Sequence, residues 1–329
     1  MSGAWDIKPE QIERAQGCLL GQVAGDSLGS LVEFRSAEQI RAEYPNGLRD
    51  LQHGGTWGTL AGQPTDDSEL ALALARTLVR LGRFDREVVR AAYVRWLESR
   101  PFDCGTTTSA GLRGIPNARS QSNGALMRVS PLGIFGARYP VHDVGDWAEQ
   151  DAALTHPHAV CRHCSALFAM AIATLVREGL QAGALYERTL QWAAERGVPR
   201  SVQSALRRAA ERPPEDYYSQ QGWVLIAFQN AFYHLLHTPS FEEAVVQTVM
   251  QGGDTDTNGA ICGALLGALY GRSAVPERWQ EAVLSCRPER SNPHCRHPRP
   301  REYWPIDLLD LARQLLQPPT AVSSDTTIP

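Results

Sequence analysis

Glycine recurs at every fourth position in two distant segments of this chain. The two series are Gly17, Gly21, Gly25, Gly29 and Gly259, Gly263, Gly267, Gly271. Spacing of four residues places each series along one face of an α-helix. A glycine inside a helix costs about 1 kcal/mol relative to alanine, so a repeated glycine indicates a face that another backbone approaches closely. We therefore expect these segments to be central helices that cross at short distance.

The remaining apolar residues recur mainly at helical spacing, and no segment shows the alternation typical of a strand. Segments rich in alanine and leucine are predicted to be helices: residues 12–31, 68–82, 86–98, 159–178, 184–195, 201–210, 222–237, 241–250, 257–270 and 305–316. Residues 46–66, 99–123 and 287–301 are expected to be irregular. The sequence thus predicts an all-α fold, with one compact domain over residues 1–316 and a flexible tail over residues 317–329.

Composition excludes several classes of protein. The formal net charge is -4 and the sequence pI is about 6.2, so no global basic field would attract nucleic acid. Lys8 is the only lysine and lies in a polar leader, which argues against P-loop, pyridoxal and Schiff-base chemistry. The first residues do not resemble a signal peptide, and the nearly apolar run at residues 166–176 is too short for a bilayer. We expect a cytoplasmic protein with no nucleic-acid or membrane partner.

Two acidic clusters stand at the starts of predicted helices, one at Thr65, Asp66, Asp67 and the other at Asp254, Thr255, Asp256, Thr257. Either Asp67 or Thr257 alone would be interpreted as a helix cap. The clusters contain more carboxylates than capping needs, and grouped carboxylates repel one another unless a cation lies between them. Because carboxylate oxygens are hard ligands, the sequence predicts a site for Mg²⁺, Mn²⁺ or Ca²⁺ rather than zinc.

Two other kinds of metal site fit the sequence less well. Asp254 and Asp256 match the first positions of a calcium-binding EF-hand loop, but the twelfth position, which needs a glutamate, is Leu265. Cys161 and Cys164 form a Cys-x-x-Cys pair near three histidines, yet no second such pair accompanies them. Buried thiols on a helix are the simpler interpretation of these cysteines.

The segment Ser122-Asn123-Gly124-Ala125-Leu126-Met127-Arg128 combines small residues with exposed backbone donors near a predicted helix start. Such a segment can hold phosphate oxygens, although a turn with a helix cap explains it equally well. His156 precedes a predicted helix in Thr-His-Pro-His. It is a candidate contact to a ligand, with a structural role as the alternative.

Taken in order, these segments resemble the ADP-ribosylglycohydrolase family. The matching motifs are Gly-Asp-Ser-Leu-Gly-Ser-Leu-Val-Glu-Phe at 25–34, Thr-Asp-Asp at 65–67, Ser-Asn-Gly-Ala-Leu-Met-Arg at 122–128, Thr-His-Pro at 155–157 and Gly-Gly-Asp-Thr-Asp-Thr at 252–257. Each motif is weak alone, whereas five in the right order are specific. The resemblance implies a compact, orthogonal multi-helix bundle with a dinuclear metal cleft that holds two divalent cations, Mg²⁺ or Mn²⁺, and ADP-ribose.

The resemblance also implies a role for each matching residue. The implied metal ligands are Thr65, Asp66, Asp67, Asp254, Asp256 and Thr257, and the implied substrate-binding residues are Ser122, Asn123, Gly124, Ala125, Leu126, Met127, Arg128 and His156. Glu33 matches a glutamate on a flexible loop near the metals, which implies an acid/base or a metal-gating role. Glu33 or Asp256 is the candidate proton acceptor. The implied reaction is metal-assisted hydrolysis at the anomeric carbon of a ribose, through a transition state like an oxocarbenium ion.

The expected substrate is an ADP-ribosylated protein, and a cognate ADP-ribosyltransferase or toxin is the expected partner. An N-glycosidic arginine linkage is the leading interpretation. It is weakened by one departure: some arginine-directed members have an acidic residue just upstream of the Asn-Gly segment, but none occurs between Asp103 and Asp143. Two alternatives stay open, a protein of the immunity type that binds ADP-ribose or a toxin without turnover, and a dimetal hydrolase of a pyrophosphate or another ADP-ribosyl substrate. The segment 287–301 is either a solvated loop or an aid to acceptor recognition.

Overall fold

The computed structural model describes residues 6–318, and this part of the chain is all α-helical without strands. Its α-helices are α1 (Pro9–Gly29), α2 (Ala37–Glu43), α3 (Asp66–Leu81), α4 (Arg86–Glu98), α5 (Thr106–Leu112), α6 (Ser130–Gly136), α7 (Val141–Ala152), α8 (Ala159–Glu178), α9 (Ala182–Glu195), α10 (Arg200–Ala209), α11 (Val224–His237), α12 (Phe241–Val249), α13 (Thr255–Tyr270), α14 (Glu277–Ser285) and α15 (Leu308–Leu316). Two short 3₁₀ helices, η1 (Arg272–Ala274) and η2 (Arg301–Tyr303), follow α13 and precede α15. The predicted all-α fold is confirmed.

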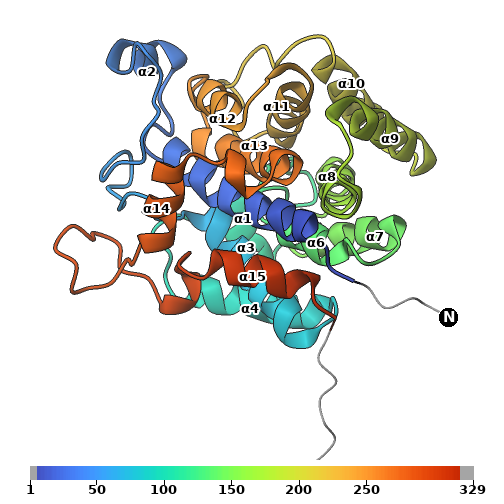
Figure 1. Cartoon of the computed structure of the whole chain (residues 1–329), viewed down its shortest axis with the longest axis horizontal. Helices are drawn as coiled ribbons and strands as arrows, with labels where there is room; N and C mark the ends of the chain where they lie inside the picture. Colours follow the sequence, from blue (N-terminus) through green and yellow to red (C-terminus); the bar gives the residue numbers. More distant parts are fainter. Residues whose placement is uncertain (1–5, 319–329) are drawn as a thin grey trace, which may run out of the picture.

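Helices α1 and α13 pack against each other along their lengths in the middle of the molecule (Figure 1). A Cβ atom added to Gly25 would lie 2.1 Å from the carbonyl oxygen of Gly259, and one added to Gly21 would lie 2.3 Å from that of Gly263. Gly17 meets Gly267 in the same way, at 2.3 Å. Residue numbers rise on one helix as they fall on the other, so the two helices are antiparallel. The predicted close approach of the two glycine faces is confirmed.

Gly271 is the exception in the two glycine series. It follows the last residue of α13 and has a φ angle of 83°. Its added Cβ would meet the side chain of Glu13 rather than a backbone atom. Gly271 therefore ends the helix with a positive φ angle that glycine tolerates, and its backbone still borders the contact face, since a Cβ added to Gly17 would lie 2.5 Å from its carbonyl carbon.

Helix α8 is buried behind this central pair and packs against α6, α7 and α13. By length and composition it could cross a membrane, but 83% of its apolar window is buried inside the fold. Cys161 and Cys164 lie on it as buried free thiols, as predicted. Its hydropathy is explained by the surrounding helices, which enclose it as a core element.

All ten predicted helices are present, with ends shifted by a few residues, and the described residues add α2, α5, α6, α7 and α14. The segment 99–123, expected to be irregular, contains α5. These additional helices have 7 to 12 residues and include glycine or polar residues. Tertiary packing stabilises such short helices more than the helix propensity of their residues does, so they are difficult to predict from sequence. In the predicted tail, residues 319–329 lie outside the described part.

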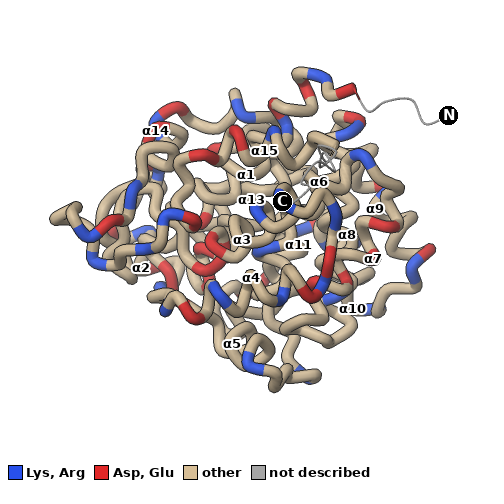
Figure 2. Tube along the Cα trace, turned by 90° about the horizontal axis from the view of Figure 1, so that it is seen from below, with Lys and Arg blue, Asp and Glu red and all other residues tan. Residues whose placement is uncertain are grey.

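The antiparallel arrangement of α1 and α13 decides where the chemical groups meet. The C-terminal end of α1 lies beside the N-terminal end of α13, since a Cβ at Gly29 would approach the carbonyl oxygen of Thr255 to 2.2 Å. The N-terminus of α3 joins them, because Thr65 donates hydrogen bonds to Asp26 of α1. Acidic positions gather beside α3 in Figure 2. Both acidic clusters therefore come to the same end of the central pair.

Candidate active site

A cleft of about 220 Å³ opens where α1, α3 and α13 meet. Six carboxylates line it: Glu33, Asp66, Asp67, Asp103, Asp254 and Asp256. Its other lining residues are Phe34, Gly105, Thr106, Thr107, Thr108, Ser122, Asn123, Gly124, Met127, His156, Gly222 and Thr257. No lysine or arginine is among these lining residues. The cleft therefore concentrates negative charge without a protein cation to balance it.

Helix starts bring the carboxylates into the cleft. Asp66 and Asp67 are the first two residues of α3, whereas Asp254 immediately precedes α13 and Asp256 is its second residue. The positive ends of both helix dipoles thus face the carboxylates, which stabilises their charged forms. Neither Asp67 nor Thr257 is the capping residue of its helix. Simple capping accordingly does not account for the two clusters.

Asp26 supplies the cap of α3 from another helix. Its carboxylate accepts hydrogen bonds from the backbone N–H of Thr65 at 3.1 Å and from that of Ser68 at 3.2 Å. The hydroxyl of Thr65 donates to both Asp26, at 2.9 Å, and Asp67, at 3.0 Å. Thr65 itself is fully buried and does not line the cleft. Its side chain orients Asp67, a function that the sequence did not reveal.

Asp103 is a site residue that the sequence analysis missed. One carboxylate oxygen each from Glu33, Asp103 and Asp256 lies within 4.8 Å of the other two, a grouping that could hold a metal ion. The loop of Asp103 is attached to α3, because the N–H of Gly105 donates to Asp66 at 3.1 Å. Asp103 is a single aspartate in an irregular segment, and tertiary contacts of its neighbours Phe102 and Gly105 bring it to the other carboxylates. Sequence spacing carried no signal for it.

Burial and mutual repulsion make these carboxylates resist ionisation. Burial, with the charges of neighbouring carboxylates, raises the pKa of Asp66 to about 6, of Glu33 to about 8 and of Asp103 to about 10. The same causes raise the pKa of Asp67 and of Asp256 well above the ordinary value. A bound cation would reverse this effect, because it stabilises the ionised form of each ligand.

The donor set fits a hard divalent cation. Among the described residues, Oδ1 of Asp67 is buried and lacks a hydrogen-bond partner. Such an orphaned carboxylate oxygen is costly unless an ion or water satisfies it. Asp254 is held toward the cleft by the side-chain amide of Asn123, which donates to Oδ2 at 2.7 Å. The predicted ligands Asp66, Asp67, Asp254, Asp256 and Thr257 all line this one cleft.

Only part of the predicted substrate segment reaches the cleft. Ser122, Asn123, Gly124 and Met127 line it, while Ala125, Leu126 and Arg128 are fully buried and do not. The guanidinium of Arg128 donates to Asp151 at 3.1 Å and to Thr155 at 2.9 Å. Arg128 therefore forms a buried ion pair that supports the segment from behind, where it is out of reach of a ligand in the cleft.

His156 lies in the cleft wall between two hydroxyl groups. Its Nδ1 is 2.7 Å from Oγ1 of Thr155, and its Nε2 is 2.9 Å from Oγ of Ser122. Burial lowers the pKa of His156 to about 3, with the charge of Arg128 as the second cause. The imidazole is thus neutral at physiological pH. It holds Ser122 in place and adds no positive charge to the cleft.

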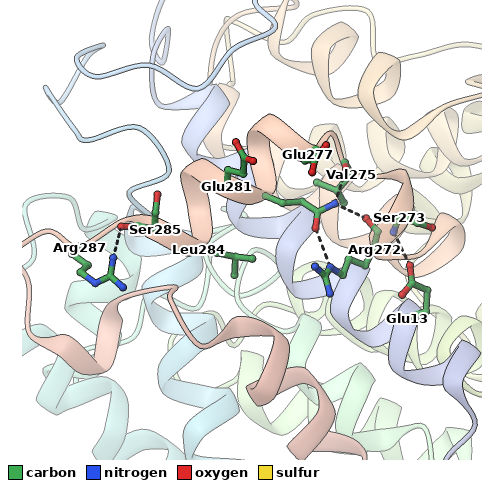
Figure 3. A pocket seen from close by; sticks show the side chains of 10 residues that line it. Glu13, Arg272, Ser273, Val275, Glu277, Glu281, Leu284, Ser285 and Arg287 are labelled. Carbon is green, nitrogen blue, oxygen red and sulfur yellow. Dashed lines mark hydrogen bonds between the residues drawn. The ribbon is translucent and has the colours of Figure 1, made fainter.

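A larger hollow lies elsewhere. It measures about 830 Å³ and is lined by residues of α1, η1 and α14, among them Glu13, Arg272 and Glu281 (Figure 3). Glu13 accepts a hydrogen bond from the N–H of Ser273 at 2.7 Å. Glu13 belongs to the start of α1 and Arg272 follows α13, so this groove lies at the opposite end of the central pair from the acidic cleft. The carboxylate grouping, and not hollow size, identifies the candidate site.

Comparison with known proteins agrees with this geometry. The sequence profile of the family described as ADP-ribosylglycohydrolase matches residues 7–317. The chain is 30% identical to the ADP-ribosyl-(dinitrogen reductase) glycohydrolase of Rhodospirillum rubrum over 82% of this chain and 90% of that protein. It is also 30% identical to the ADP-ribosylarginine hydrolase Tri1 of Pseudomonas putida, over 86% of this chain and 77% of that one.

A similar architecture is found in a solved structure titled ADP-ribosylglycohydrolase-related protein complex. It superposes with a TM-score of 0.74 at 26% identity, over 94% of this chain and 99% of that chain. The human ADP-ribosylhydrolase ARH3 is 27% identical over 82% of this chain and 89% of its own. The family match thus spans nearly all of the helical fold together with its acidic cleft, and the chain belongs to the ADP-ribosylglycohydrolase family.

Proposed function

We propose that this chain is a dinuclear metal hydrolase that removes ADP-ribose from modified protein side chains, most readily from arginine. The observation that carries the proposal is the convergence of six carboxylates, from α3, α13 and two loops, on one cleft without a lining lysine or arginine. Hydrolysis of a glycosidic bond needs charge stabilisation at the sugar and a group that accepts a proton from water. The cleft offers carboxylates for both tasks.

Asp66, Asp67, Asp254, Asp256 and Thr257 are the residues that would hold two divalent cations, Mg²⁺ or Mn²⁺. When bound, such cations orient the ribose hydroxyls and activate water for attack. Thr65 supports this set indirectly, because its hydroxyl donates to Asp67 at 3.0 Å.

The remaining lining groups bind and orient the substrate. Gly124 lets Thr108 and His156 pack closely against the wall, since an added Cβ would lie 2.7 Å from Oγ1 of Thr108 and 3.0 Å from Cε1 of His156. Ser122, Asn123 and Gly124 therefore present a narrow polar surface suited to the hydroxyls and phosphates of ADP-ribose. Glu33 and Asp256 are the candidate acceptors for the proton of the attacking water.

The arginine linkage is supported by the charge of the cleft. A guanidinium leaving group is cationic and is stabilised electrostatically by nearby carboxylates, whereas a neutral serine hydroxyl is not. Asp103 supplies an acidic side chain to the cleft even though no Asp or Glu follows it before Asp143. The name of the Pseudomonas putida relative also specifies ADP-ribosylarginine.

The decisive experiment incubates the purified protein with arginine-linked and serine-linked ADP-ribosyl peptides, with Mn²⁺, with Mg²⁺ or with a chelator. We expect metal-dependent release of intact ADP-ribose, faster from arginine, by mass spectrometry. Asp66→Ala and Asp256→Ala should lose at least about a hundredfold in kcat/KM, as expected for metal ligands. Asp143→Ala is the matched control, since Asp143 is an exposed carboxylate of α7.

Other outcomes would refute the proposal and favour the two alternatives. Release of AMP from ADP-ribose would indicate a pyrophosphate hydrolase. Calorimetric binding of ADP-ribose without any product, in the presence of either metal, would indicate a protein that acts by binding.

A further inference from the structure

The irregular segment 287–301 packs closely against the loop that precedes α3. The imidazole Nε2 of His297 donates to the backbone carbonyl of Trp57 at 2.7 Å, and the side-chain amide of Gln63 donates to the carbonyl of His297 at 2.9 Å. The side chain of Arg296 covers Gly58, where an added Cβ would meet Arg296 Cδ at 2.8 Å. This part of the segment is therefore held in place rather than freely solvated.

A buried ion pair anchors the same segment on its other side. The guanidinium of Arg299 donates to both carboxylate oxygens of Glu69, each at 2.7 Å, and these side chains are 2% and 1% exposed. Glu69 belongs to the first turn of α3, next to Asp66 and Asp67. A paired bidentate contact of this kind fixes both the distance and the orientation of its partners. Residues 296–299, called the strap below, are thus attached to the helix that carries two cleft carboxylates.

The strap reaches the carboxylate of Glu33 through Trp57, while the hydroxyl of the adjacent Thr56 donates to the backbone carbonyl of Glu33 at 2.9 Å. The indole Nε1 of Trp57 donates to Oε2 of Glu33 at 2.5 Å. The ring of Phe102 lies between the rings of His297 and Trp57, 4.5 Å from the former and 6.1 Å from the latter. Because His297 holds the backbone of Trp57 and Phe102 packs on its ring, the indole has little freedom to turn away from Glu33.

Glu33 needs such a contact to stay in the cleft. Its carboxylate lies beside those of Asp103 and Asp256, and the negative charges of Asp254 and Asp66 disfavour its ionised form. The next residue, Phe34, has a φ angle of 65°, in the left-handed region that disfavours any residue but glycine, and its side chain is 47% exposed. Backbone strain and charge repulsion therefore both oppose the observed position of Glu33, and the indole N–H favours it.

We propose that the strap and Trp57 are a positioning device for Glu33, in which His297 sets Trp57 and Trp57 holds the Glu33 carboxylate toward the ribose. This inference rests on the proposed function, because it assumes that Glu33 acts on the reaction. It gives segment 287–301 a task inside the enzyme, different from both acceptor recognition and a solvated loop.

The first test is the variant Trp57→Phe, which keeps a smaller aromatic ring beside Phe34 and Phe102 and removes the indole N–H. We expect kcat on an arginine-linked ADP-ribosyl peptide to fall by about tenfold to a hundredfold, the usual range for one hydrogen bond to a charged group. KM and the calorimetric affinity for ADP-ribose should stay within about twofold, since the indole does not line the cleft. His297→Ala should behave similarly, and His297→Gln, which retains an N–H donor, should restore part of the rate.

A double-mutant cycle distinguishes the positioning of Glu33 by Trp57 from a general loss of structural stability. If Trp57 acts through Glu33, Trp57→Phe should have almost no further effect on kcat in a Glu33→Gln background. The matched control is Trp279→Phe, because the indole of Trp279 also donates a hydrogen bond at 2.7 Å, to the backbone carbonyl of Arg49, but away from both the cleft and the strap. This control should lower the melting temperature and leave kcat within about twofold.

Hydrogen exchange gives a readout that does not depend on catalysis. Exchange of the amides at residues 31–36 should accelerate at least about tenfold in Trp57→Phe and in His297→Ala, and it should be unchanged in Trp279→Phe. Equal losses of kcat in the Glu33 and Glu33→Gln backgrounds, or unchanged exchange at 31–36, would overturn the inference. If wild type releases no ADP-ribose, the proposed function fails, and the exchange measurement still decides whether the strap holds Glu33.

Discussion

Alanine at Gly25 tests the close approach of the two central helices. An added Cβ would lie 2.1 Å from the carbonyl oxygen of Gly259 and 2.5 Å from its carbonyl carbon. Ordinary contacts between such atoms are longer than 3 Å, and both obstacles are backbone atoms that no rotamer change can move. The helices would have to separate by about 1 Å along a contact that runs the length of both.

The magnitude follows from two opposing effects. Alanine favours the helical state by about 1 kcal/mol relative to glycine. Overpacking a well-filled interior costs about 1–3 kcal/mol, and more where the backbone must shift. Because the separation also reduces packing at neighbouring glycine contacts, we expect Gly25→Ala to lower the free energy of unfolding by about 2 kcal/mol or more.

The matched control is Gly183→Ala in α9. Gly183 is also a helical glycine, but nothing lies within 4 Å of its added Cβ. This control should therefore stabilise the protein by about 0.5–1 kcal/mol, through helix propensity alone. Urea unfolding followed by circular dichroism measures both variants. Equal stability of Gly25→Ala and wild type, or a gain like that of Gly183→Ala, would refute the reasoning.

Alanine substitutions in the contact between α1 and α13 should affect metal binding in the cleft more strongly the nearer they lie to it. Gly25 lies one residue before Asp26, which caps α3, whereas Gly17 lies two helical turns earlier. Gly25→Ala and Gly17→Ala should both destabilise the fold, but only the former should weaken the rise in melting temperature that Mn²⁺ produces. Melting curves with and without Mn²⁺ compare the two variants directly.

Three further outcomes follow from the charged groups. Without metal, stability should fall as pH rises from about 7.5 to 8.5, because Glu33, whose pKa is raised to about 8, keeps a proton in the folded state that the unfolded chain has lost; buried His156 is neutral in the folded state and largely neutral in the unfolded chain over this range, and Mn²⁺ should abolish this slope in thermal melts. Asp67→Asn should raise the metal-free stability by about 1 kcal/mol by relieving repulsion, and it should lower Mn²⁺ affinity at least about tenfold in a calorimetric titration. Arg299→Met should cost about 3–5 kcal/mol in urea unfolding by leaving Glu69 buried and unpaired, while the double variant with Glu69→Met should recover most of this loss.

The central packing could be predicted from the sequence because glycine at every fourth position of a helix is costly unless another backbone lies against it. The acidic clusters could be predicted for a similar reason, since each combines several carboxylates with a helix start. In both cases, a local pattern of residues corresponds directly to a physical requirement. Helices α6 and α7 show no such pattern in their sequences. Packing against α8 stabilises them, and this contact cannot be predicted from their own residues.

The composition of the cleft could be predicted only in part. Asp103 has no neighbours in sequence that suggest a ligand, and the tertiary contacts of Phe102 and Gly105 bring it to the cleft. Arg128 belongs to a matching motif, yet its full burial and its ion pair with Asp151 follow from tertiary packing. A motif thus indicates which segments approach the site, whereas the direction of each side chain depends on partners distant in sequence.

The glycine faces also bear on the precision of the cleft. Helix α1 carries Asp26 and leads to Glu33, while α13 carries Asp256, so the relative position of the two helices sets the distances between these groups. A slip by one helical turn would move the groups by about 5.4 Å, more than the 4.8 Å within which the oxygens of Glu33, Asp103 and Asp256 gather. Backbones in direct glycine contact resist such a slip, because larger side chains flank each glycine and would collide. The glycines are costly for helix stability, but they fix the register of α1 against α13. The grouping of the Glu33, Asp103 and Asp256 carboxylates requires this register.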